Sequence, residues 1–268
     1  LLSHFVLKNL QEEMGSSFSA LLPTLDKLSL NDKLNNYEKD KLRNFYEQAL
    51  KISDIELAYN SPKLLKLLKI LKEFNDKVLI FTKYKATQKV ITDFLKKHNF
   101  LVAEFHGGMR RAEKEAQIQN FRENAQVLVS TETGGEGRNL QFCNCIINYD
   151  LPWNPMAIEQ RIGRIHRVGQ TRDVYVYNLA AKNTVEYYIL DLLDRKINMF
   201  ELVVGEVDMI LGDLEETEDF SDIIMDAWVR SPKPSDMENE IESISLKMLE
   251  NKQQYIKVKE LDDRLFGE

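Results

Sequence analysis

Residues 127–170 read VLVSTETGGEGRNLQFCNCIINYDLPWNPMAIEQRIGRIHRVGQ, and this stretch decides the fold. Its pattern is a short apolar strand, a glycine-rich loop, a second strand, a proline-bounded turn, and a helical segment that carries Arg161, Arg164 and Arg167. Glycine lets a backbone approach a phosphate or a ribose closely. Arginine can bind phosphoryl oxygens through two parallel hydrogen bonds. The stretch therefore predicts a sheet edge that faces a nucleotide.

Apolar strands and amphipathic helices alternate on both sides of this stretch. The expected strands cover residues 77–81, 100–104, 127–130, 145–149 and 174–178, and the expected helices between them include 86–97 and 110–123. Such alternation is typical of βαβ units, so we expect an α/β fold with a parallel sheet flanked by helices. Ligands of these sheets bind beyond the carboxyl ends of the strands. Thr82-Lys83, His106-Gly107 and residues 131–137 all fall at that edge.

The regions outside the alternating pattern suggest three parts. Residues 1–60 have leucines at helical spacing and predict a helical connector or protrusion. Ser61-Pro62 is typical of a helix start, and the following amphipathic KLLKLLKILKEF favours a helix packed on the sheet over one on a membrane surface. Residues 61–204 form the expected core domain. Residues 205–268 predict an acidic, partly helical extension, with a helix from about 237 to 261 and a solvated acidic loop before it.

Composition excludes some classes and leaves others open. The 268 residues are 43% hydrophobic and 29% charged, and the net charge is −7. Residues 205–268 hold 18 acidic and 7 basic residues, so the remainder is mildly basic and leaves room for a phosphate-binding face. No run approaches the roughly 18 apolar residues of a membrane span, and no membrane partner is expected. The chain begins LLSHF without Met, which suggests a piece of a longer protein.

Cysteines, histidines and phosphate-binding motifs give further expectations. Cys143 and Cys145 stand one residue apart, a spacing that suits neither a zinc knuckle nor a redox pair, so we expect reduced core thiols and an intracellular compartment. His106 and His166 have no companions at metal-ligand spacing, so no metal site is predicted. The chain contains no GxxxxGK[ST] and no evident Mg²⁺ ligand, so by itself it should not hydrolyse a nucleotide.

The order of several motifs resembles a known family. The segments KVLIFTKY, FHGGM, VLVSTETGGEGRNLQ, NYDLPWNP, EQRIGRIHRVGQ and VYVYNLAAKNTVEYYI follow one another over residues 60–200. This order resembles the second RecA-like lobe of superfamily 2 helicases, and the WNP and HRVGQ elements are similar to Snf2-family ATPases. The forms GGEGRNLQ and QRIGR look more like the bacterial, RapA-like members than like chromatin remodellers. The resemblance implies a RecA-like sheet.

The resemblance also assigns roles to matching residues. Arg164 and Arg167 match the arginine fingers that reach the γ-phosphate held by the first lobe, and helical spacing would put both on one face. Arg161 is expected to serve structure. The implied ATP-binding residues are Gly137, Asn139 and Gln160. The implied nucleic-acid contacts are Thr82, Lys83, His106, Gly107, Thr131 and Trp153, and for Trp153 a buried packing role is the alternative.

The function that the resemblance implies is that of a motor lobe. The expected protein is an ATP-dependent translocase on double-stranded DNA, with ATP and Mg²⁺ bound mainly by a first RecA-like lobe of the same polypeptide. A cytoplasmic, nucleoid-associated protein of a bacterium or archaeon is expected. One rival hypothesis is an RNA helicase or an ATPase that recycles RNA polymerase. The other is a non-catalytic interaction module that uses the acidic extension.

Overall fold

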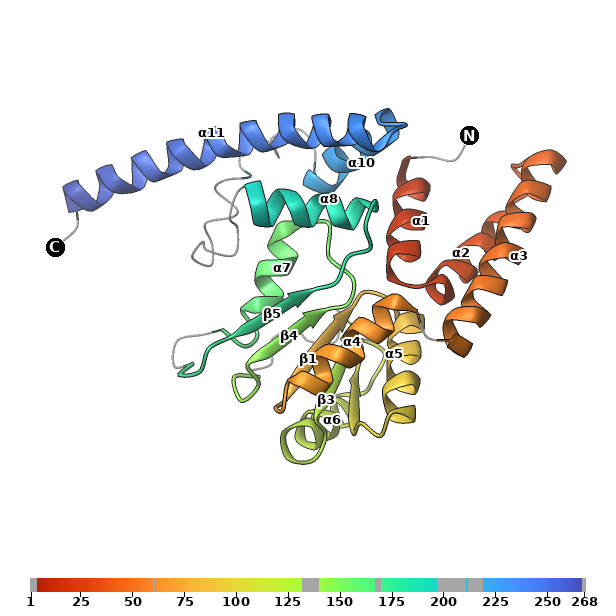
Figure 1. Cartoon of the computed structure of the whole chain (residues 1–268), viewed down its shortest axis with the longest axis horizontal. Coiled ribbons are helices and arrows are strands. Elements are labelled where there is room, and N and C mark those ends of the chain that lie inside the picture. Colours follow the sequence, from red (N-terminus) through yellow and green to blue (C-terminus); the bar gives the residue numbers. More distant parts are fainter. Residues whose placement is uncertain are drawn as a thin grey trace. The chain divides into compact units, whose positions relative to one another are not determined.

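A computed structural model of the chain describes residues 4–59, 61–131, 140–166, 170–196, 211 and 219–266 (Figure 1). The chain divides into two compact units, one made of residues 1–150 and 164–179 and the other of residues 151–163 and 180–268. The predicted boundaries at 60 and 204 stay a prediction.

The first unit is built on a five-stranded parallel sheet. Its strands are β1 (Val78–Thr82), β2 (Val102–Phe105), β3 (Val127–Thr131), β4 (Cys145–Asn148) and β5 (Tyr175–Asn178), in the spatial order β2-β3-β1-β4-β5. Val78 in the central strand pairs with Val127 on one side and with Cys145 on the other. All four pairings are parallel, so the carboxyl ends of the strands meet at one edge. The predicted fold class is confirmed.

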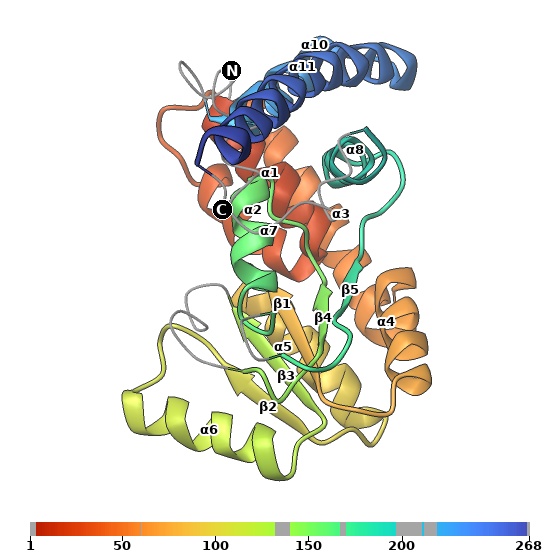
Figure 2. The ribbon, with the colours of Figure 1, turned by 90° about the vertical axis from the view of Figure 1, so that its left-hand side faces the viewer.

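Helices cover both faces of this sheet because its central strands are apolar on both sides. On one face α4 (Pro62–Glu73) and α5 (Lys85–Lys97) pack on a core that includes Ile80, Val129 and Ile147. On the other face α6 (Arg111–Glu123) and residues 140–143 pack on a core that includes Leu79 and Leu128. Figure 2 shows α4 and α6 on opposite sides of the sheet.

Helix α4 starts as its sequence predicts. Ser61 is the N-cap, and its hydroxyl accepts a hydrogen bond from the backbone N–H of Leu64. Pro62 occupies the first turn, where no intrahelical N–H bond is lost. Its leucine stripe is buried on the sheet, which confirms the packing interpretation over a membrane-surface one.

The N-terminal helices of the first unit are α1 (His4–Ser16), α2 (Phe18–Ser29) and α3 (Asn36–Tyr59). Leu21 and Leu25 of α2 pack with Leu42 and Ala49 of α3 in a small separate core. Ser17 caps α2 through its hydroxyl, which accepts a hydrogen bond from the N–H of Ala20. The helical prediction for this region is confirmed.

The second unit is helical in its described residues. It contains α7 (Pro155–Ile162), α8 (Val185–Asp191), the π-helical turn η2 (Leu192–Lys196), α10 (Phe220–Arg230) and α11 (Pro234–Phe266). The sequence of residues 184–201, TVEYYILDLLDRKINMFE, also predicts an amphipathic helix. This helix is present as α8 and η2 up to residue 196, and residues 197–201 lie outside the described residues. Helix α10 was not expected, because acidic residues interrupt its apolar pattern. No helix in the described ranges is long and apolar enough to cross a membrane.

Candidate functional site

The carboxyl-end edge of the sheet brings several predicted residues together. Thr82 ends β1, Thr131 ends β3, and the two residues are direct partners in the parallel register. His106 and the exposed Gly107 follow β2, whose last residue pairs with Ser130 of β3. Residues that are far apart in the sequence therefore share one edge. Their predicted roles in nucleic-acid binding stay predictions.

Asp150 organises this edge, and the sequence interpretation did not include it. Its carboxylate, 4% exposed, accepts hydrogen bonds from Thr82 Oγ1 at 2.6 Å, Ser16 Oγ at 2.7 Å and the backbone N–H of Lys83 at 2.9 Å. These bonds hold the segment after β1 against the segment after β4. An acidic residue directly after an apolar strand was the available signal, since Asp150 follows β4 at the predicted edge.

Helix α1 covers the same edge. The ammonium group of Lys83 donates a hydrogen bond of 2.5 Å to Glu12, whose side chain is almost fully buried. Ser16 Oγ and Ser17 Oγ lie 2.8 Å and 2.7 Å from the hydroxyl of Thr87 on α5. Both of the groups predicted to bind a nucleic-acid backbone after β1, Thr82 and Lys83, thus already have internal partners.

His106 lies half-buried at the outer end of the edge. Burial, and next the ammonium group of Lys85, lower the pKa of its imidazole from the usual value near 6.5. Its Nδ1 is buried and has no hydrogen-bond partner in the described part of the chain. A neutral imidazole with an unused nitrogen can either donate or accept, depending on its tautomer.

Arg164 stands in a turn and not in a helix. Helix α7 ends at Ile162, and the N–H of Gly163 closes it with a hydrogen bond to Glu159 O. The expectation that one helix face carries Arg164 and Arg167 is therefore wrong for Arg164, because the helix ends before it.

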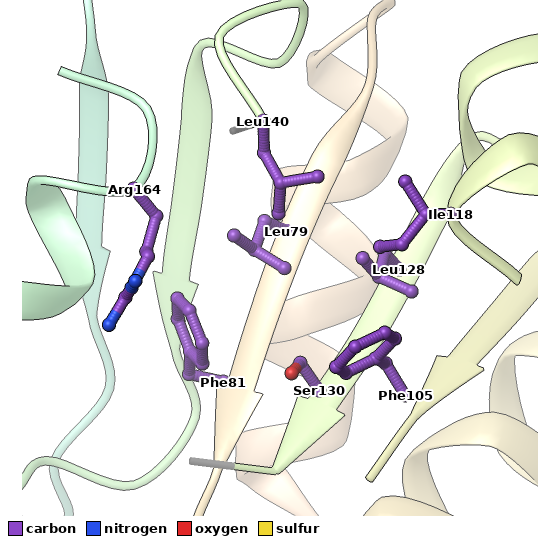
Figure 3. Close-up of a pocket in the computed structure, with 8 residues that line it drawn as sticks. All are labelled: Leu79, Phe81, Phe105, Ile118, Leu128, Ser130, Leu140 and Arg164. Carbon is purple, nitrogen blue, oxygen red and sulfur yellow. The ribbon is translucent and has the colours of Figure 1, made fainter. Parts of the chain in front are cut away.

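The Arg164 side chain nevertheless points to the expected edge. Its guanidinium lies beside Phe81 and extends in the direction in which β1 and β3 run (Figure 3). The residue is half-buried, and its guanidinium makes no hydrogen bond or ion pair with residues that the structure describes. The carboxyl-end edge is where parallel sheets of this class bind ligands, and a half-buried cation without a carboxylate partner there is able to receive an anion.

The remaining predicted residues lie either in the second unit or outside the residues that the structure describes. Gln160 is exposed and Arg161 is buried on α7 in the second unit. Trp153 in the same unit is 3% exposed, and its indole N–H has no partner among the described residues. That burial favours the packing alternative, and the nucleic-acid role of Trp153 stays a prediction. The other predicted residues, Gly137, Asn139 and Arg167, lie outside the described residues.

The two cysteines have the structural role that their spacing predicts. Cys143 and Cys145 are free and buried, and burial raises the pKa of each thiol to about 12. Within the described residues no group of three or more His, Cys, Asp or Glu side chains could hold a metal ion.

Comparison with known proteins places this sheet and edge in a family. Residues 62–169 match the helicase conserved C-terminal domain. The chain is 42% identical over 246 residues to YqhH of Bacillus subtilis, described as an uncharacterized ATP-dependent helicase, and the match covers 91% of this chain. The chain carries a helicase C-terminal domain of the Snf2 type. The matched region contains the whole carboxyl-end edge from Thr82 to Arg164.

Other relatives of this Snf2-type helicase domain match shorter parts. The RNA polymerase-associated protein RapA of Vibrio campbellii is 36% identical over 136 residues, 49% of this chain and 14% of RapA. The C-terminal part of the Fun30 ATPase domain aligns with a TM-score of 0.48 and 23% identity over 80% of this chain and 82% of that chain. The chain spans 43% of the length of YqhH, so the activity of a whole protein is a matter of proposal.

Proposed function

We propose that this chain is the second motor lobe of an ATP-dependent translocase on double-stranded DNA, and that Arg164 is one of its arginine fingers. The observation that carries the proposal is the Arg164 guanidinium, half-buried at the ligand-binding edge and without an anionic partner among the described residues. A buried or half-buried cation is costly unless an anion neutralises it. A phosphate group delivered from outside the chain fits this requirement.

ATP with Mg²⁺ fits this edge only as a ligand that another part of the protein holds. The chain lacks a P-loop sequence, and the described residues contain no cluster of carboxylates for a metal ion. ATP supplies the phosphoanhydride bond whose hydrolysis drives movement. Arg164, together with Arg167 as matched from the sequence, would stabilise the charge that develops on the transferred phosphoryl group, an effect of about 10³–10⁵-fold in rate.

The second part of the proposal concerns the nucleic-acid backbone. Thr82, Lys83 and Thr131 share one edge because β1 and β3 are parallel. The Arg164 side chain points toward the same edge. Backbone phosphates carry no base sequence, so contacts of this kind suit a protein that moves along DNA without regard to sequence. Closing and opening of two lobes around ATP would alternate the grip on the backbone.

The finger is tested by replacing Arg164 with Ala in the full-length protein. We expect ATPase activity at saturating duplex DNA to fall by about 10³-fold or more, because transition-state charge loses a partner. Arg111 is an exposed arginine on α6 in an ion pair with Glu115, and Arg111→Ala is the matched control that should keep normal activity. Near-normal ATPase activity of the Arg164→Ala variant would show that Arg164 is not an arginine finger.

An RNA helicase or an ATPase that recycles RNA polymerase is the second candidate, and the 36% identity to the RNA polymerase-associated protein RapA is the observation that favours it. Stimulation of the full-length ATPase by duplex DNA and by single-stranded RNA at equal phosphate concentration separates the two. If RNA stimulated the ATPase activity more strongly than duplex DNA, the RNA alternative would replace the proposal of a DNA translocase. A non-catalytic interaction module would gain support if neither nucleic acid stimulated any hydrolysis.

A further inference from the structure

A cavity of about 440 Å³ opens between α5 and β2, the edge strand of the sheet. Its size falls in the range of small-molecule sites. Seven polar side chains line it: Lys85, Gln88, Lys89, Thr92, Asp93, Glu104 and His106. Of these residues only His106 has a role expected from the sequence. The motor-lobe proposal gives no role to the other six polar residues of the lining.

Two polar atoms of the lining are buried without partners. Thr92 is 1% exposed, and neither its Oγ1 nor Nδ1 of His106 has a hydrogen-bond partner in the described part of the chain. By contrast, the amide of Gln88, which also lines the cavity, donates to Phe105 O at 3.1 Å and to Val129 O at 2.8 Å. An unpaired buried polar atom is unfavourable because it has lost its hydrogen bonds to water. Two in one cavity point to a ligand that supplies the missing partners.

One end of the cavity suits an anion. A Cβ atom placed on Gly108 would lie 3.4 Å from His106 Nδ1 and 3.6 Å from Lys85 Nζ, so the two nitrogens flank one small volume that the glycine leaves open. Lys89 lies one helical turn from Lys85 on the same face of α5. An ammonium group and an imidazole flank this open volume, and a second lysine lies one turn along the same lining, a set that favours a phosphate group.

The other end of the cavity suits hydrogen-bond donors. Asp93 lies about 12 Å along α5 from Lys85, from the rise of the helix. The exposed Asp93 carboxylate and the Thr92 hydroxyl can accept hydrogen bonds there, whereas Glu104 is already paired with Lys96 at 3.1 Å. A ligand with a phosphate at one end and hydroxyl or amino groups at the other fits this polarity.

We propose that the cavity binds one nucleotide unit, with its phosphate at Lys85, Lys89 and His106 and its sugar or base donors at Thr92 and Asp93. The unit can be a free nucleotide or part of a nucleic-acid strand. In the second case the proposal extends the backbone contact expected of His106 and rests on the proposed function. Binding of a free nucleotide does not depend on ATP hydrolysis or on a first lobe, so the two proposals can fail separately.

His106 provides the readout. The charged groups near its imidazole are Lys85 on α5, Glu104 on β2, and Lys114 and Glu113 on α6. Its pKa is lowered in the free protein, first by burial and then by Lys85. A bound phosphate stabilises the imidazolium and therefore raises the pKa of His106. By linkage, affinity for the phosphate should increase as the pH falls through the pKa of His106.

The experiment is an NMR titration of the four histidine side chains in the 268-residue chain with deoxyadenosine monophosphate, inorganic phosphate and deoxyadenosine. We expect the monophosphate to shift the His106 resonances, to raise its pKa, and to bind at least fivefold more tightly than either half alone. Lys85→Met and Lys89→Met should each weaken binding at least fivefold. Lys97→Met is the control, because Lys97 is exposed on the same helix but does not line the cavity.

Gly108→Ala is the sharpest variant. Its methyl group would enter the anion position at ordinary contact distances from the His106 and Lys85 side chains, so the fold should be kept while phosphate binding is lost. An unshifted His106 with all three ligands, or equal binding by Gly108→Ala and the parent chain, would overturn the site. Equal affinity for phosphate and the monophosphate would overturn the assignment of the Thr92 end.

The source of the nucleotide is decided by competition. If a short duplex displaces the bound monophosphate, the cavity belongs to the path of a nucleic-acid strand. If both bind together, the cavity is a separate site for a free nucleotide.

Discussion

At the scale of single residues, the candidate edge depends on one buried carboxylate. Asp150 accepts hydrogen bonds from two hydroxyl groups and one backbone N–H that come from α1 and from the end of β1. Hydrogen bonds to a charged acceptor are stronger than those between neutral groups. The orientation of Thr82 and Lys83, and hence any grip on a phosphate, therefore depends on Asp150.

Replacement of Asp150 by Ala should destabilise the first unit by about 3 kcal/mol or more, because it leaves three buried or half-buried donors without their acceptor. Urea unfolding followed by circular dichroism measures this loss as a lower midpoint. Asp54 is exposed on α3, so Asp54→Ala should change stability by less than about 0.5 kcal/mol. Equal midpoints for both variants would contradict the central role of Asp150.

At the scale of elements, α1 contacts the segment after β1 that is proposed to bind nucleic acid. The Glu12 carboxylate of α1 occupies the ammonium group of Lys83, the group that a backbone phosphate would need. Neither element would predict this contact alone, since α1 and β1 are separated by α2, α3 and α4. If Lys83 binds DNA as expected, its ammonium group must exchange the Glu12 carboxylate for a backbone phosphate.

Glu12→Gln should therefore tighten the binding of duplex DNA several-fold at low salt. In this variant the Lys83 ammonium group no longer has to give up the charged Glu12 carboxylate when it binds a phosphate. The slope of log affinity against log salt should become steeper by up to about 0.9, the value for one phosphate contact. Fluorescence anisotropy with a labelled duplex at several salt concentrations measures both quantities.

The matched control for this prediction is Glu47→Gln, an exposed carboxylate on α3. Addition of Lys83→Met to Glu12→Gln should abolish the gain. If Glu12→Gln and Glu47→Gln bind DNA equally well, Glu12 does not compete with the backbone for Lys83.

At the scale of the whole molecule, the chain matches less than half of YqhH and contains no P-loop sequence. The proposed cleft therefore needs a partner that holds the triphosphate. We expect the 268-residue chain alone to show only background ATP hydrolysis with duplex DNA present. Addition of the rest of the full-length protein as a separate polypeptide should restore hydrolysis, measured as phosphate release.

The same reconstitution with Arg164→Ala in the 268-residue chain is the internal control, and it should stay at background. Substantial hydrolysis by the parent chain alone would mean that it holds the β- and γ-phosphates itself. That result would contradict the assignment of this chain to half of a catalytic cleft.

The sequence by itself determined the sheet and the edge at which the carboxyl ends of its strands meet. Continuous apolar runs such as that of β1 can only be buried on both faces, and alternation with helices makes the strands parallel, so their carboxyl ends must meet. Thr82, Thr131 and His106 were therefore placed correctly from strand positions. Local signals also predicted the start of α4, because Ser61 and Pro62 act through neighbouring backbone groups.

Only the tertiary structure decided which polar groups meet at that edge. The partners of Lys83 and Thr82 are Glu12 and Asp150, and they lie 67 or more positions away in the chain. Periodicity places a residue on a face or at an end, but side-chain contacts across elements depend on how the chain packs. For this reason the sequence predicted neither that α7 ends before Arg164 nor that a cavity lies beside β2.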